Sequence, residues 1–250
     1  ALDCEITRWM HFDRKNYFYA DLPKGYQITQ DKKPICRNGK ILIRLEDGKT
    51  KNIELNRIHM EEDSGKSIHD LDPFNTLIDL NRAGVPLLEI VTEPVIKTSF
   101  EAYQYVSEIR KLLRYLDICD GNMEEGSMRC DVNISIMPIG SLKFGDRVEI
   151  KNLNSIRNVQ RSIDYEIVRQ ATLIEKGVKI NVETIISYAK QIYNANKDIY
   201  RELYEIEREL GTSTPSVQPS AMSTTPMSSA QPMSMDGRRY AWEGGGQIRK

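Results

Sequence analysis

Two stretches of alternating side chains constrain the fold of this chain more than any other feature. Apolar side chains occupy every second position in Asp131–Ile136, and Val148 and Ile150 continue the pattern in Arg147–Leu153. Successive side chains of a strand point to opposite faces of a sheet, so each stretch is predicted to bury one face. If the two strands pair, their other faces form one polar floor; the alternative is an ordinary solvated sheet face. This floor would carry Asp131, Asn133, Ser135, Arg147, Glu149 and Lys151.

Turn signals and helical periodicity predict the neighbouring elements. Ile41–Leu45 and Lys51–Ile58 flank an Asp-Gly turn and predict a hairpin, and Val85–Val91 is predicted as a short strand whose proline suits an edge position. A capping box at Thr98 opens an amphipathic helix over roughly 99–117, and a second helix begins near Ile156 and ends at a glycine. Residues 1–184 are therefore predicted to form an α+β domain, a mostly antiparallel sheet cradle with flanking amphipathic helices.

The pattern changes beyond residue 184. Apolar residues at alternating steps of four and three, with one asparagine, predict a long heptad helix over residues 185–210. This helix would either take a coiled-coil partner or pack on the neighbouring core. Residues 211–250 are rich in Ser, Thr, Pro and Met and are predicted to be a disordered tail.

Charge and cysteine usage exclude several classes of protein. The 35 Lys and Arg residues nearly balance the 36 Asp and Glu residues, so a nucleic acid would have to bind a local patch. Residues 1–45 offer one such patch, with nine basic and five acidic side chains, although a solvated basic surface is the alternative. The four cysteines form no CxxC pair, which argues against a zinc ribbon or a disulfide framework. No apolar run approaches the ~18 residues of a membrane span, so we expect no membrane segment.

Acidic clusters point to a site for a metal ion and a phosphate. Glu124 and Glu125 lie between glycines and are followed by Arg129 and Asp131, and such a cluster is unfavourable unless a cation balances it. His59–Ser67 contains three consecutive acids and then Gly, Lys and Ser, without the spacing of a P-loop. Glu89 lies within an apolar strand, where an acid needs a partner or a metal. Carboxylate ligands suit Mg²⁺.

Two further segments mix cations with aromatic residues. Asp13–Tyr19 and Asp21–Gln27 contain the lysines and tyrosines that often contact nucleotides, or they are tyrosines with extended lysines at a domain edge. The three histidines show no metal-ligand spacing, and no GxSxG or Cys-His signature suggests a covalent nucleophile. Phosphoryl transfer fits what remains, since it depends on positioning and charge neutralisation.

Five motifs together resemble one family, the B subunit of the glutamyl-tRNA(Gln)/aspartyl-tRNA(Asn) amidotransferase. They are DRKNYFYADLPKGYQITQ from Asp13, HMEEDSGKS from His59, LIDLNRAGVPLLEIVTEP from Leu77, GNMEEGSMRCDVNIS from Gly121 and EIKNLNSIRNVQRSIDYEI from Glu149. The resemblance runs from Ala1 to about Thr184. It implies a ligase that uses ATP and Mg²⁺ to phosphorylate the carboxyl of Glu-tRNA(Gln) or Asp-tRNA(Asn). Ammonia from a glutaminase A subunit would then displace the phosphate, with a small C subunit bracing the pair.

The resemblance also assigns roles to residues. It implies that Glu62 and Glu89 bind the metal and that Lys15 contacts phosphate or the activated carboxyl. Residues assigned to the same polar cradle as catalytic groups are Glu124, Glu125, Asp131 and Lys151, and those assigned to the nucleotide are Lys15, Lys66 and Arg129. Arg129 is alternatively an ion-pair scaffold for the acids.

Two departures from the family pattern lead to a second hypothesis about the function of this chain. The family's upstream strand with a Glu-x-His pair is expected to precede Ala1, and the family's helical and tail domains are replaced by residues 185–250. A catalytically incomplete fragment that binds tRNA or the A subunit is therefore the second hypothesis. The tail composition favours a mitochondrion over the bacterial cytoplasm as the compartment.

Overall fold

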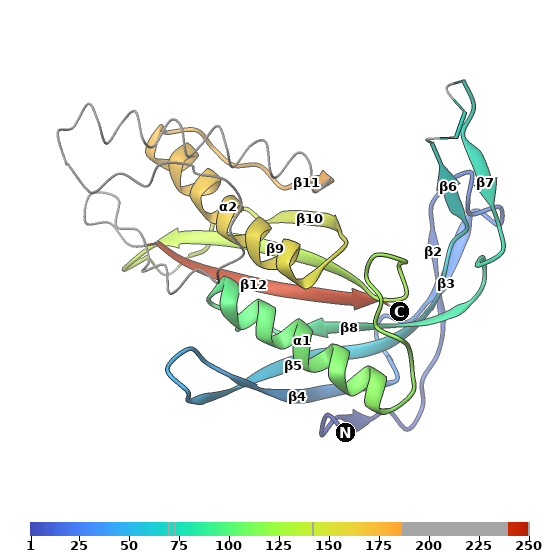
Figure 1. Cartoon of the computed structure of the whole chain (residues 1–250), viewed down its shortest axis with the longest axis horizontal. Helices are drawn as coiled ribbons and strands as arrows, with labels where there is room; N and C mark the ends of the chain where they lie inside the picture. Colours follow the sequence, from blue (N-terminus) through green and yellow to red (C-terminus); the bar gives the residue numbers. More distant parts are fainter. Residues whose placement is uncertain (70, 73, 142, 187–239, 250) are drawn as a thin grey trace, which may run out of the picture.

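The molecule is built on one large, mostly antiparallel sheet. The computed structural model describes residues 1–69, 71–72, 74–141, 143–186 and 240–249. In these residues the strand order is β1-β4-β5-β8-β12-β9-β10-β11, and only the β10–β11 pair is parallel (Figure 1). The strands are β1 (Glu5–Ile6), β4 (Cys36–Arg44), β5 (Thr50–Glu62), β8 (Pro86–Thr92), β9 (Arg129–Pro138), β10 (Val148–Leu153), β11 (Glu183–Ile186) and β12 (Tyr240–Arg249).

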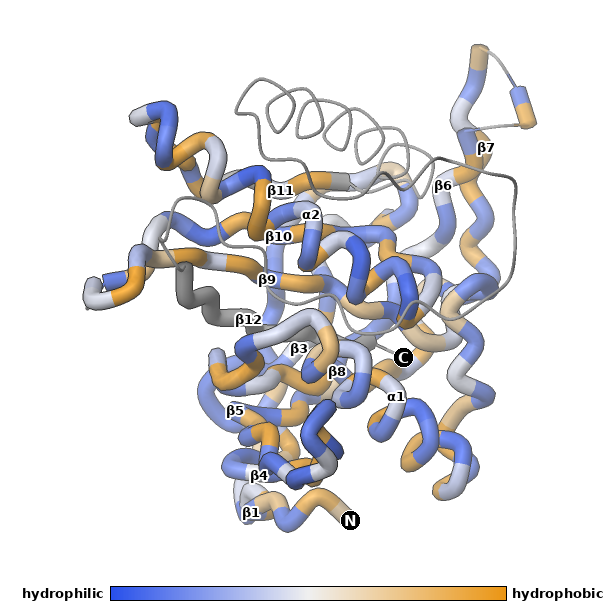
Figure 2. The backbone as a smooth tube through the Cα atoms, turned by 60° about the vertical axis from the view of Figure 1, so that its left-hand side comes forward, coloured by the Kyte–Doolittle hydropathy of each residue, from blue (hydrophilic) through white to orange (hydrophobic). Residues whose placement is uncertain are grey.

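Two amphipathic helices cover one face of this sheet, α1 (Ser99–Tyr115) and α2 (Ile156–Glu175). Their apolar stripes and the inward side chains of the strands form one core, with Ile109 and Ile134 fully buried. Figure 2 shows hydrophobic and hydrophilic residues alternating along these elements, as one-sided burial requires. Neither helix has the length and hydrophobicity of a membrane-crossing segment.

The helix starts follow the capping rules. The Thr98 hydroxyl accepts a hydrogen bond from the Glu101 backbone N–H at 3.1 Å, as a capping box predicts. The Glu101 carboxylate instead accepts from the Lys97 backbone N–H at 2.7 Å and from Lys51 Nζ at 2.8 Å. Ser155 caps α2 in the same way, through the backbone N–H of Asn158. The helix starts are therefore set by local side-chain chemistry, and Lys51 ties α1 to β5.

Two hairpins extend from one end of the sheet. β2 (Asp13–Asn16) pairs with β3 (Tyr26–Thr29), and β6 (Lys66–Ile68) pairs with β7 (Leu77–Asp79). In Figure 1 they rise together beyond the ends of β5 and β8. The Gly65 backbone N–H donates to the Asp21 carbonyl at 2.8 Å, which joins the two hairpins.

The structure confirms most of the expected elements of residues 1–184. The alternating stretches pair as β9 and β10, the Asp-Gly turn joins β4 to β5, and both helices lie where expected. All four cysteines are free. The edge position suggested for the proline-containing strand is wrong, because β8 lies between β5 and β12. Pro86 is the first residue of that strand, where its missing N–H leaves the central pairing intact.

The C-terminal residues differ from expectation. Residues 240–249, within the predicted disordered tail, form β12, which fills the space between β8 and β9. Backbone pairing explains this position, since two neighbouring strand edges offer unpaired N–H and C=O groups to any extended segment. The predicted heptad helix lies outside the described residues except for Ile185 and Ile186, which belong to β11.

Candidate active site

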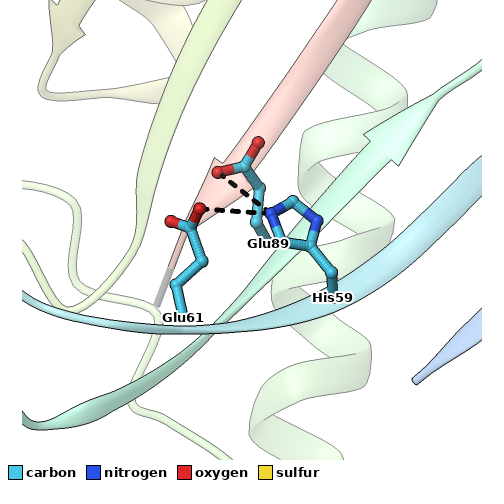
Figure 3. A group of neighbouring side chains, drawn as sticks. All are labelled: His59, Glu61 and Glu89. Atoms are coloured by element: carbon cyan, nitrogen blue, oxygen red, sulfur yellow. Dashed lines mark hydrogen bonds and ion pairs between the residues drawn. The ribbon is translucent and has the colours of Figure 1, made fainter. Parts of the chain in front are cut away.

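Three buried polar side chains meet on the sheet face opposite the helices. His59 and Glu61 are two residues apart on β5, so they point to the same face, and Glu89 on β8 pairs with His59 in register. Their exposed fractions are 3%, 6% and 2%. Figure 3 shows the imidazole directed toward both carboxylates. Strand alternation and strand register therefore bring together groups that lie about 30 residues apart in the sequence.

The distances within this triad are short. His59 Nε2 lies 3.2 Å from Glu61 Oε1 and 3.9 Å from Glu89 Oε2. One ligand atom from each of the three residues lies within 4.8 Å of the others. Two side chains of the β2–β3 hairpin fix the Glu61 carboxylate. Thr29 Oγ1 donates a hydrogen bond to Glu61 Oε1 at 2.9 Å, and Gln27 Nε2 donates one to Glu61 Oε2 at 3.4 Å.

This triad fits a divalent metal ion. Two buried carboxylates this close repel each other, and a cation between them removes that repulsion. Ligands around one Mg²⁺ at about 2.1 Å are roughly 3–4 Å apart, which agrees with the two distances from His59 Nε2. The other ring nitrogen of His59, Nδ1, is buried and has no hydrogen-bond partner among the described residues. The carboxylates favour Mg²⁺ or Mn²⁺, and the imidazole extends the choice to transition metals.

A cavity of about 640 Å³ opens above the triad. Its walls come from the β2–β3 hairpin, β5, β8 and β10, and the residues that line it beyond the triad are Asp13, Arg14, Lys15, Thr29, Gln30, Asp31, Arg57, Glu149 and Lys151. Four of these residues are cationic, and they line the same cavity as the acidic triad. Such an arrangement suits a phosphorylated ligand that binds together with a metal ion.

Several predicted site residues take part in this cavity. Glu89 belongs to the triad and Lys15 lies on the rim, where its Nζ stands 5.7 Å from the centre of the Tyr17 ring. Lys151 Nζ lies 3.5 Å from Glu149 Oε2 and 3.9 Å from Asp131 Oδ2. The polar face predicted from strand alternation is therefore present on β9 and β10, where Lys151 contacts Glu149 of its own strand and Asp131 of the neighbouring strand. Arg147 precedes β10 and is exposed, and Asp131 does not line the cavity.

Glu62 does not belong to the triad. It follows Glu61 on β5 and so faces the other side, where it forms an ion pair with Lys24 and accepts a hydrogen bond from the Ile28 backbone N–H at 2.8 Å. Burial alone would raise the pKa of Glu62, but Lys24 and the Ile28 N–H outweigh burial and hold this pKa below its usual value. The contacts of Glu62 thus anchor the β2–β3 hairpin.

The other predicted residues also lie outside the cavity lining. Lys66 is exposed on β6, and Glu124 and Glu125 are exposed in a turn where their backbone N–H groups donate to Asn122 Oδ1. Arg129 forms an ion pair with Asp63 rather than with those two acids. Its contact is that of an ion-pair scaffold, but the partner is Asp63 and not the acids for which this role was predicted.

Sequence reasoning misses two members of the triad. The three histidines show no metal-ligand spacing along the chain, which hides His59, and Glu61 stands among acidic neighbours of similar type. The available signal is the His-x-Glu spacing on a strand, which places both side chains on one face. The partner across the sheet, Glu89, is visible as an acid in an apolar strand.

Comparison with known proteins gives matches over most of the chain. Residues 1–242 match the family model described as the GatB/GatE catalytic domain, which extends beyond Thr184, where the sequence motifs end. Proteins named as the B subunit of aspartyl/glutamyl-tRNA(Asn/Gln) amidotransferase are 54% identical over 189 residues in Synechococcus sp. and 51% identical over 203 residues in Myxococcus xanthus. These alignments cover 74% and 81% of this chain. The chain spans about 40% of the length of these curated relatives.

Proposed function

Since this chain belongs to the GatB/GatE catalytic-domain family, we propose that it supplies the phosphorylating site of a tRNA-dependent amidotransferase B subunit. The proposed substrate is Glu-tRNA(Gln) or Asp-tRNA(Asn), and the proposed cofactors are ATP and Mg²⁺. A glutaminase A subunit and a C subunit are the proposed partners. The relatives carry a name that specifies tRNA amidotransfer, and the cavity has the charges that such a reaction needs.

The chemistry has two steps. A side-chain carboxylate oxygen of the aminoacyl group attacks the γ-phosphorus of ATP, and ADP leaves. Ammonia then attacks the acyl carbon, the bond from that carbon to the bridging oxygen breaks, and inorganic phosphate leaves with the carboxyl oxygen that had attacked phosphorus, while the nitrogen loses a proton and the other carboxyl oxygen stays in the amide. The first step is needed because a carboxylate is a poor electrophile and the acyl phosphate supplies a leaving group.

The residues of the cavity divide this work. His59, Glu61 and Glu89 would hold the metal ion, which when bound neutralises phosphate charge. Arg14 and Lys15 on the rim would bind phosphate oxygens, and the β2–β3 hairpin that carries them would position the nucleotide. Lys151, held between Glu149 and Asp131, places one more positive charge on the floor.

The observation that carries the proposal is the buried triad inside a ring of cations. Two carboxylates and an imidazole at metal-ligand distances, beneath a cavity large enough for a nucleotide end, have a simple explanation in Mg-ATP binding. We therefore expect the purified chain to bind ATP in calorimetry when Mg²⁺ is present and to lose that binding in EDTA.

Variants sharpen this test. Glu89→Gln should abolish Mg²⁺-dependent ATP binding, whereas Glu54→Gln, an exposed acid on the same strand as His59 and Glu61, should preserve it. The chain mixed with the A and C subunits, glutamine and Mg-ATP should convert Glu-tRNA(Gln) to Gln-tRNA(Gln). Binding of tRNA without any ATP binding would refute the proposal in favour of a non-catalytic binding fragment.

A further inference from the structure

Arg57 is a half-buried cation of the cavity that lacks a carboxylate partner among the described residues, whereas the other two cavity cations without such a partner, Arg14 and Lys15, are exposed to solvent. Arg57 lies two residues before His59 on β5 and lines the same cavity. Its Nη1 donates to Asn56 Oδ1 at 3.3 Å, and its Nε is buried without a hydrogen-bond partner in that part of the chain. A half-buried guanidinium without a carboxylate is unfavourable unless a ligand supplies the missing negative charge.

Neighbouring charges increase this need. Arg37 on β4 stands directly opposite Arg57 in the β4–β5 register, so two guanidinium side chains are cross-strand neighbours. Like charges in this position destabilise a sheet. Arg37 is partly satisfied by the backbone carbonyls of Lys32 and Asp31, at 2.9 and 3.4 Å. Arg57 has no comparable group of acceptors in the part of the chain that the structure describes.

Two of the acids that line the cavity, Glu61 and Glu149, have other partners. Glu61 accepts from Thr29 and contacts His59, and Glu149 contacts Lys151 and accepts from the Thr184 hydroxyl at 3.2 Å. Within the described residues, none of the carboxylates that line the cavity forms an ion pair with Arg57. The guanidinium is therefore available to an incoming anion.

We propose that Arg57 is the oxyanion-binding residue of this cavity and that the ligand's terminal phosphate or carboxylate bridges Arg57 and the metal triad. Residues two apart on a strand are separated by about 7 Å, a span that one phosphate with its metal ion covers. The planar guanidinium can bind two oxygens of a phosphate or of a carboxylate side by side. The inference rests on the proposed function only for the identity of the anion.

The test compares Arg57→Gln with Arg57→Lys, and Arg44→Gln serves as the control because Arg44 is exposed at the end of β4, outside the cavity. Calorimetry with inorganic pyrophosphate and with ATP, each with Mg²⁺, measures anion binding. Loss of a charge-assisted contact should weaken binding by roughly 10- to 100-fold in Arg57→Gln, with partial recovery in Arg57→Lys. Mn²⁺ binding, measured by electron paramagnetic resonance, should persist in Arg57→Gln because the triad is intact.

The outcomes separate the possible sources of the anion. Weaker pyrophosphate and ATP binding would assign Arg57 to phosphate. Unchanged ATP binding with a lost preference for Glu-tRNA(Gln) over deacylated tRNA would assign it to the aminoacyl carboxylate. If Arg57→Gln keeps both properties of the wild-type chain, the inference is wrong and the proposed function stands. Arg57-dependent pyrophosphate binding without amide transfer would contradict the proposed function alone.

Discussion

Replacing Glu89 by glutamine should stabilise the protein in the absence of metal and remove its stabilisation by Mg²⁺. The ligand atoms of Glu61 and Glu89 lie within 4.8 Å of each other, so two negative charges there repel by about 3.5 kcal/mol at an effective dielectric constant near 20. The hydrogen bonds that Thr29 and Gln27 donate to Glu61 offset part of this repulsion. We therefore expect the free energy of unfolding of metal-free Glu89→Gln to rise by about 2 kcal/mol, since the amide keeps the size of the side chain.

Thermal unfolding followed by circular dichroism measures this difference. A gain of about 2 kcal/mol corresponds to a Tm increase of roughly 4–8 °C in a domain of this size. In the wild-type chain, Mg²⁺ at ten times its dissociation constant should add about 1.4 kcal/mol, and the variant should show no such gain. Glu54→Gln should match the wild-type chain in both conditions. A Glu89→Gln variant that is less stable than the wild-type chain without metal, or that still responds to Mg²⁺, would refute the metal assignment of the triad.

Two further predictions concern ion pairs outside the triad. Lys24→Met should flatten the pH dependence of stability. The pKa of Glu62 is lowered in the folded protein, so the ionised Glu62 stabilises the fold near neutral pH, and this stabilisation is lost as the pH falls through the lowered pKa. Urea unfolding at several pH values between 7 and 3 checks this, and parallel curves for wild-type and variant chains would contradict it. Arg169→Met should lower the free energy of unfolding by about 3 kcal/mol, because the fully buried Glu166 loses two hydrogen bonds of 2.8 and 2.9 Å. The control is Arg161→Met on the exposed face of α2, which should change the free energy of unfolding little. The double variant Glu166→Met/Arg169→Met should recover most of that loss, and no recovery would mean that packing rather than charge explains it.

Local patterns predicted the elements that depend on local causes. The alternation of Val132, Ile134 and Ile136 required a half-buried strand, and Thr98 fixed the start of α1 through its own hydroxyl. The interior position of β8 could not be predicted, because its neighbour β12 comes from about 150 residues further along the chain. Composition marked those residues as tail, and only the two open strand edges explain their pairing.

The candidate site was predicted in part by residue: Glu89, Lys15 and Lys151 were named, whereas His59 and Glu61 were not. His59-Met-Glu-Glu-Asp63 contains three adjacent acids, and choosing between Glu61 and Glu62 requires knowing which face of β5 carries the cavity. The β2–β3 hairpin decides this, because its Lys24 forms an ion pair with Glu62 and its Thr29 donates a hydrogen bond to Glu61. Long-range packing, rather than the motif itself, separates the residue that anchors the hairpin from the residue in the triad.

The place of β12 in the sheet has a consequence for the order in which the protein folds. Strands β4, β5 and β8 pair with near neighbours in sequence, as do β9 and β10, so two half-sheets form from short loops. β12 pairs with both half-sheets, and its contact with β8 closes a far longer loop. The chain must lose the conformational entropy of that loop before the backbone hydrogen bonds between β12 and β8 can form. The sheet therefore becomes continuous late. Until then, β8, which carries Glu89, is an open edge able to pair with another chain.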